Sequence, residues 1–304
     1  MDPIKVLGYE SCAKCHENEV NVWRRSRHHQ TFRELHREPE AKQIADRMGL
    51  RSIKRGDVCI NCHYTRQVKS GKVRAVSGIS CESCHGPARD WIKLHNDYGD
   101  EHITKEQESP QHHEERLQLS VAAGMNNPVN PYLIARNCLN CHTTPHEELV
   151  NIGGHSAGSK DFDFVAWSQG SVRHNFLRGG SASNTSSSSD RLQLMYVVGL
   201  MTDLEYSLRA TAKATELDTY GFTVAARAHN LRIKLAELQL QLQNQYLQPA
   251  VDAALSVKLK TENADNLIVA ADQVGTAAYA FAENVDGSTL GVVQHMMPAP
   301  DSYK

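Results

Sequence analysis

The chain has 304 residues, a formal net charge of -2 and only 6% aromatic residues. The length suffices for one large or two modest domains with a buried core. The nearly balanced charge favours neither nucleic acid nor an acidic membrane surface as a partner, and no run of 18 or more apolar residues predicts a membrane-spanning segment.

All eight cysteines occur in the pattern Cys-x-x-Cys-His, which is the attachment motif of c-type haem. Two thiols at this spacing can add to the two vinyl groups of one porphyrin, and the following histidine becomes the proximal ligand of the iron. A zinc knuckle or a redox dithiol would not need a histidine at the same offset four times. The sequence therefore predicts four covalently attached haems c. The four motifs are Cys12, Cys15 and His16; Cys59, Cys62 and His63; Cys81, Cys84 and His85; and Cys138, Cys141 and His142.

Four haems would change both the core and the charge of the protein. They would supply apolar volume that aromatic residues otherwise provide, and their propionates would lower the net charge to about -6, which slightly favours a basic partner. The first residues do not resemble a signal peptide, although c-type haem is attached outside the cytoplasmic membrane. We therefore expect a periplasmic or extracellular protein whose export signal has been removed.

Two histidines follow a motif at a distance that excludes the same iron. Residues 17–29 lack Gly and Pro and predict a helix that contains His28. Twelve helical residues rise roughly 18 Å, whereas two nitrogens on one iron lie about 4 Å apart, so His28 and His16 serve different irons. By the same reasoning His95, at the end of a predicted helix over 88–95, and His85 ligate different irons. The alternative for His28 is a solvated position in an arginine-rich stretch.

Between these segments the sequence predicts surface structure. Residues 34–52 are charged and predict a surface helix, and Lys69–Lys72 predicts a turn between two short extended segments. The charged segment that contains His102, His112 and His113 predicts a loop with solvated histidines.

The first and third motifs, together with Trp23, His28 and His95, make residues 8–145 similar to the tetrahaem cytochrome c-554 family. This resemblance implies an electron carrier for hydroxylamine oxidation and a relationship to the multihaem nitrite reductases. It also implies that His95 ligates the first haem and His28 the third. The family's second haem is five-coordinate, so the resemblance implies an open iron above His63, and it leaves the distal ligand of the fourth haem open.

His155 and His174 are the candidates for the remaining axial positions. His155 follows two glycines, which allow the backbone to approach a porphyrin closely. His174 follows Trp167 in an arrangement similar to that of Trp23 and His28. The alternative for both is an ordinary surface histidine.

The composition changes after a Gly/Ser-rich stretch. Residues 179–190 predict a linker between a tetrahaem domain over 1–178 and a haem-free helical domain over 191–304. Apolar residues at helical spacing fill 191–259, with a break at Pro249, and a further helix is predicted over 264–284. The predicted fold is mostly α, a multihaem cytochrome c domain with little regular β structure followed by a C-terminal helical bundle, whose apolar stripes form a core or the interface of a homo-oligomer.

These features predict an electron carrier that moves electrons along four closely spaced haems between a redox protein donor and an acceptor. The alternative is an enzyme with one five-coordinate haem that acts on hydroxylamine, nitric oxide, nitrite or peroxide. A carrier is favoured over an enzyme because the sequence has no Cys-x-x-Cys-Lys motif and no dedicated catalytic trio. A third possibility is a structural subunit whose bundle docks the haem domain into a larger redox complex.

Overall fold

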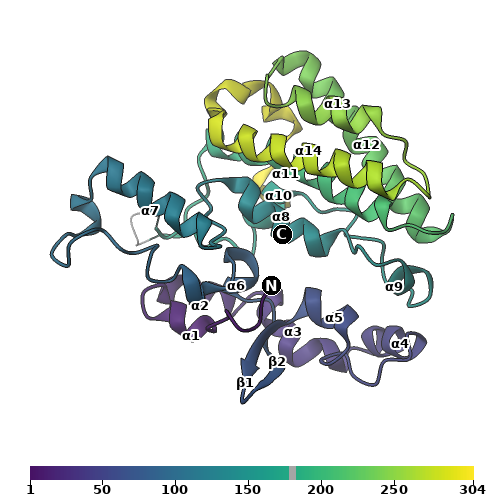
Figure 1. Ribbon diagram of the computed structural model, residues 1–304, viewed down its shortest axis with the longest axis horizontal. Coiled ribbons are helices and arrows are strands. Elements are labelled where there is room, and N and C mark those ends of the chain that lie inside the picture. Colours follow the sequence, from purple (N-terminus) through teal and green to yellow (C-terminus); the bar gives the residue numbers. More distant parts are fainter. Residues whose placement is uncertain (178–182) are drawn as a thin grey trace.

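The computed structural model describes residues 1–177 and 183–304, and helices dominate it (Figure 1). Within these ranges the only β structure is the hairpin of β1 (Thr65–Lys69) and β2 (Lys72–Ser77). Its strands are antiparallel, and Ser70 and Gly71 take positive φ in the turn. The predictions of a mostly α fold and of a turn at Lys69–Lys72 are confirmed. None of the described helices is long and apolar enough to cross a membrane.

Short helices make up most of the regular structure in the first 168 residues. They are α1 (Tyr9–Ala13), α2 (Glu17–Trp23), α3 (Arg27–Glu34), η1 (Leu35–Arg37), α4 (Pro39–Arg47), α5 (Asp57–His63), α6 (Cys81–His85), η2 (Ala88–Asp90), η3 (Lys105–Gln107), α7 (Pro110–Ala122), α8 (Pro131–His142), α9 (Glu147–Asn151) and α10 (Phe164–Ser168).

Three local predictions in this part differ from the structure. The helix predicted over 17–29 is two helices, because Ser26 begins a new one: its hydroxyl accepts a hydrogen bond from the His29 N–H, as an N-cap does. Residues 88–95 form the 3-10 helix η2 and turns instead of an α-helix. The segment predicted as a loop becomes α7 from Pro110 onward, after the N-cap Ser109.

Longer helices follow. They are α11 (Ser189–Ala212), α12 (Thr219–Leu242), α13 (Gln248–Ser256), α14 (Ala264–Asn284), η4 (Gly287–Met296) and η5 (Pro300–Ser302). The range of α14 is the predicted one. Pro249 lies in the first turn of α13, where its missing N–H costs nothing, so it begins a helix where the sequence suggested a break.

The main core joins these long helices to the fourth haem motif. α11 packs against α12, α14 and α8, and Tyr132, Leu133 and Phe164 from the preceding part of the chain are buried in the same apolar cluster as α11–α14. The division at residues 179–190 stays a prediction, and residues 178–182 lie outside the described ranges. Ser189 already belongs to α11.

A second, small core lies among α3, α4, α5 and β2. Ala45, Ile53, Cys59, Ile60 and Tyr64 are its buried members. Figure 1 shows these elements on the side of the molecule away from α11–α14. The second haem motif is therefore embedded in its own compact unit.

Candidate haem sites

Each haem motif is presented by a turn of helix. α5, α6 and α8 all end at the histidine of their motif, and the first motif runs from the end of α1 to His16, the N-cap of α2. Residues three and four positions apart lie on one face of a helix. One helical turn therefore puts both thiols and the histidine of a motif on the same side, where a single porphyrin can meet all three.

Every proximal histidine faces a second histidine from a distant part of the chain. The ring centroids of these pairs are 6.1 to 6.4 Å apart. The pairs are His16 with His95, His28 with His142, His63 with His155, and His85 with His174.

This spacing is the one that an iron with two axial imidazoles requires. If each ring binds the iron through one nitrogen at about 2 Å, the two ring centroids lie roughly 6 Å apart. The observed distances agree with this value in all four pairs. The residues present therefore fit four haems with two histidine ligands each.

The pairing differs in two places from what the sequence resemblance implied. His95 lies opposite His16, as expected for the first haem. His28 lies opposite His142 of the fourth motif rather than His85 of the third. It reaches there because α3 packs beside α5, where Thr31 donates a hydrogen bond to the His63 carbonyl at 3.1 Å.

The remaining two candidates complete the other pairs. His155 lies opposite His63, the position where the resemblance implied an open iron. His174 lies opposite His85. The neighbouring His29 is not part of a pair of this kind, since its ring packs against Trp23 with centroids 4.4 Å apart.

Hydrogen bonds at Nδ1 orient the histidine rings so that Nε2 can bind iron. In five of the eight paired histidines Nδ1 faces an oxygen, and an acceptor there keeps the proton on Nδ1 and leaves Nε2 free as a ligand. The partners are Asn126 O for His85 at 3.4 Å, Ile92 O for His95 at 2.7 Å, Ser159 Oγ for His142 at 3.0 Å, Ser156 O for His155 at 2.9 Å, and Val172 O for His174 at 2.6 Å.

The electrostatics of these sites favour neutral imidazoles. Burial lowers the pKa of His63, His85 and His142 to about 4, and the opposite histidine contributes to the shift in all three. Iron binds the neutral form of histidine. These three half-buried proximal rings are therefore in the protonation state that ligation needs.

Contacts between cysteines place the four motifs next to one another in a definite order. Cys12 of the first motif lies beside Cys81 of the third, and Cys62 of the second beside Cys141 of the fourth, close enough for the two thiols of each pair to shift each other's pKa. α6 packs on α8, where the Asn137 side chain donates to the Cys84 carbonyl at 3.0 Å. The spatial order is thus first, third, fourth, second.

Burial raises the pKa of Cys84 to about 11. All eight cysteines are free thiols. They are therefore available to add to a porphyrin, and none is consumed by a disulfide.

Glu82, inside the third motif, holds the N-terminal segment of the chain against this motif. Its carboxylate accepts hydrogen bonds from the backbone N–H groups of Leu7, Gly8 and Ala88 at 2.8 to 2.9 Å, and the residue is 1% exposed. Because Leu7 and Gly8 lead into α1, these bonds hold Cys12 beside Cys81.

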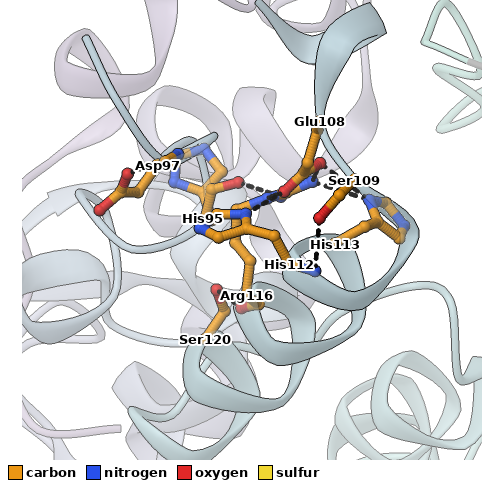
Figure 2. A network of polar contacts seen from close by, with 9 residues as sticks. His95, Asp97, Glu108, Ser109, His112, His113, Arg116 and Ser120 are labelled. Carbon is orange, nitrogen blue, oxygen red and sulfur yellow. Dashed lines mark hydrogen bonds and ion pairs between the residues drawn. The ribbon is translucent and has the colours of Figure 1, made fainter. Parts of the chain in front are cut away.

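A second polar network supports His95, as Figure 2 shows. Arg116 donates to the His95 carbonyl at 2.5 Å and binds both oxygens of Glu108 at 2.6 and 2.7 Å. His112 and His113 also face Glu108, at 2.8 and 3.0 Å, and Arg116 holds the pKa of the Glu108 carboxyl well below its usual range. Two of the histidines predicted to be solvated thus belong to a network that fixes a candidate ligand.

Glycines near the motifs serve close contacts within the protein. Gly86 has φ of 87°, and a Cβ there would lie 2.2 Å from the Gly124 carbonyl oxygen. At Gly153 a Cβ would meet the Leu149 carbonyl at 2.4 Å, and the Gly153 carbonyl accepts from Arg47 Nε at 2.8 Å. The sequence suggested that such glycines let the backbone approach a porphyrin, whereas the neighbours in the structure are other backbone segments.

The supporting residues could not have been found from local sequence. Glu82, Asn126, Arg116 and Arg47 all act on segments far away in the chain, and no spacing rule marks them. The only sequence signal for a supporting residue was Glu82, at the second position of the third motif. The motif does not require a charged residue there, so its presence indicates a partner elsewhere in the chain.

Comparisons with known proteins agree with the motifs. A model of the family "Cytochrome c554 and c-prime" matches residues 11–86, which contain the first three motifs. The chain is similar to cytochrome c-554 from Nitrosomonas europaea (strain ATCC 19718 / CIP 103999 / KCTC 2705 / NBRC 14298), with 28% identity over 100 residues, which is 30% of this chain and 43% of that protein.

The chain thus matches less than half the length of this curated relative. No solved structure shows significant similarity to it. The matched region carries the haem-binding pattern that the geometry above explains, and it relates this chain to the cytochrome c554 family, in which haem c is bound covalently.

Proposed function

We propose that the chain is an extracytoplasmic electron carrier with four covalently bound haems c. The observation that carries the proposal is the set of four histidine pairs at 6.1 to 6.4 Å, each combined with a Cys-x-x-Cys motif. Haem c supplies a one-electron redox centre, and the chain supplies the ligands, their orientation and the spacing between centres. The relationship to cytochrome c-554 supports an extracytoplasmic location.

Neighbouring thiols define the route that electrons would follow. Thiols attach at the vinyl edge of a porphyrin, so two motifs whose cysteines touch hold two porphyrin edges close together. The contacts of Cys12 with Cys81 and of Cys62 with Cys141, and the packing of α6 on α8, support a conduit in the order first, third, fourth, second. Its ends are the first and second motifs, which would exchange electrons with the donor and the acceptor.

The histidine pairs favour a carrier over an enzyme. Small-molecule chemistry at a haem needs one open iron position. Here a histidine faces each proximal ligand, and His155 occupies the place opposite His63 where an open position was expected. An arrangement in which every iron has two protein ligands suits electron transfer, because neither oxidation state then requires a ligand to enter or leave.

Two measurements on the purified protein test the proposal. Mass spectrometry of the denatured protein should give a mass increase of four haems, because each motif holds one by thioether bonds. Electron paramagnetic resonance should show low-spin ferric centres only. Fewer than four haems in fully matured protein would contradict the site assignment, and a high-spin centre would favour the enzyme alternative.

We also propose that residues 191–304 are a haem-free region for association. Motivation comes from large apolar side chains that α12 leaves exposed, such as Phe222 at 61% and Leu240 at 79%. Light scattering of the full chain and of an α12 variant with Phe222→Ser and Leu240→Ser tests this idea. An unchanged oligomeric state in the variant would contradict it.

A further inference from the structure

We propose that a basic surface on residues 24–74 docks an acidic protein partner, which exchanges electrons at the second motif. The inference rests on the proposed function, because it names the partner at one end of the conduit. The basic surface consists of Arg24, Arg25, Arg27, Arg33, Arg37, Lys42, Arg47, Arg51, Lys54, Arg55, Arg66, Lys69, Lys72 and Arg74.

The charge of the chain is divided unevenly. Residues 24–74 contain fourteen Lys or Arg and five Asp or Glu, a net charge of +9, whereas all other residues together carry -11. The small total charge, which slightly favoured a basic partner, therefore conceals one strongly basic segment. A partner responds to the local field, because salt screens charges beyond about 8 to 10 Å.

Most of these basic side chains are available for binding, although Arg47 also holds the Gly153 carbonyl. In the ranges that the structure describes, none of the fourteen forms an ion pair, and twelve of them are exposed. Three arginines elsewhere behave differently, since Arg116, Arg209 and Arg227 bind carboxylates at 2.6 to 2.7 Å. The basic surface thus keeps its charge free, whereas these three arginines are neutralised by near neighbours.

The surface covers the unit that holds the second haem motif. Cys59 is buried in the small core of α3, α4, α5 and β2, and the basic residues lie on these same elements or beside them. Lys54 Nζ lies 4.0 Å from the ring centroid of Phe32 and 5.9 Å from that of Tyr64, the residue after His63. A partner bound to this surface would therefore sit next to one end of the conduit.

The opposite end of the conduit has the opposite charge. Residues 97–116, which lead from His95 into α7, contain seven Asp or Glu against Lys105 and Arg116, a net charge of -5. Figure 1 shows α1, α2 and α7 at the left of the molecule and α4 and α5 at the right. Opposite charges at the two ends would let two partners bind without competing for one surface.

An acidic protein fits this surface better than the other anionic macromolecules. A nucleic acid or an extended anionic membrane reaches beyond a single surface and would also meet the residues that carry -11. A protein can confine its acidic groups to the size of the basic surface. Complementary charge of this kind mainly accelerates association and orients the two proteins.

Stopped-flow kinetics can test the docking site directly. The probe is reduced plant-type ferredoxin, a small acidic iron–sulfur protein, which is mixed with the oxidised holoprotein. Arg51→Glu with Arg55→Glu reverses two exposed charges of the basic surface next to the second motif, and Lys258→Glu with Lys260→Glu makes the same change of net charge at exposed positions after α13. Both variants should take up four haems and be fully reduced by dithionite.

At low salt we expect the surface variant to lose about tenfold in the second-order rate constant, whereas the control variant loses less than about twofold. The two should converge at about 1 M salt, where the screening length is about 3 Å. Equal losses in both variants, or no loss in either, would overturn the proposed surface. The proposal would also be overturned if the parent bound phosphatidylserine vesicles, the surface variant alone lost this binding, and its rate with ferredoxin stayed unchanged. Failure of dithionite to reduce the haems would instead contradict the proposed function.

Discussion

Glu82 offers the sharpest test of how the first and third motifs are held together. The substitution Glu82→Gln keeps the size of the side chain but replaces one carboxylate oxygen by an NH2 group. In the parent, one oxygen accepts from Leu7 N and Ala88 N and the other from Gly8 N. The amide can satisfy only one of these two sets, so at least one backbone N–H loses its acceptor.

The magnitude follows from these contacts. A buried donor without a partner costs about 1 to 3 kcal/mol, and hydrogen bonds to a charged group are worth about 1.5 to 3 kcal/mol each, about twice the value of neutral ones. Loss of one acceptor and weakening of the other two bonds should therefore lower the free energy of unfolding by about 2 to 4 kcal/mol. Glu82→Ala removes all three acceptors and should cost more.

Guanidinium unfolding of the holoprotein measures this change, and hydrogen exchange of the Leu7, Gly8 and Ala88 amides localises it. Glu101→Gln is the matched control, since the Glu101 side chain is 87% exposed. We expect faster exchange at the three amides in the Glu82 variant alone. Equal unfolding midpoints for the Glu82 and Glu101 variants would refute the assignment of these bonds as the connection between the two motifs.

Three further variants test other parts of the molecule. His155→Met should convert one low-spin haem to a centre of different ligation, visible by electron paramagnetic resonance, whereas His229→Met should leave the spectrum unchanged; identical spectra would remove His155 from the ligand set. Burial raises the pKa of Glu205 above its ordinary value of 4.5, so the folded state binds this proton more tightly and loses stability as the pH rises from 4.5 through the raised pKa. In urea unfolding, the stability of Glu205→Gln relative to that of the parent should therefore increase as the pH rises from 4.5 to 7.5. A decrease in this difference over the same range would contradict the sign. Leu208→Ala, at a fully buried core position, should cost about 2 to 5 kcal/mol, while Leu240→Ala on the exposed face of α12 should cost less than about 0.5 kcal/mol.

The sequence predicted the elements that depend on local patterns. The haem motifs, the turn at Lys69–Lys72 and the range of α14 follow from residue spacing and from turn and helix propensities over short distances. The break of the predicted helix at Ser26 was missed because a serine inside a helical pattern cannot be recognised as an N-cap from the sequence alone. It can be recognised only if the residues before it are known to be non-helical.

The partners of the ligands could not be predicted in the same way. Whether His28 faces His85 or His142 depends on how α3 packs beside α5, and this packing is set by contacts across the chain. His155 is similar, because its position relies on Arg47 binding the Gly153 carbonyl from α4. A resemblance to a family transfers ligand roles only as far as such contacts are shared.

The histidine pairs also imply an order of folding. They connect positions between 79 and 114 residues apart, and contacts of such long range form slowly, whereas helices that follow one another in the chain associate fast. The contacts of α11 with α12 and of α13 with α14 join successive helices. We therefore expect the C-terminal helices to fold first. The N-terminal segments would then gain order one ligand at a time, and until the last histidine binds they would remain the part of the chain most open to proteolysis.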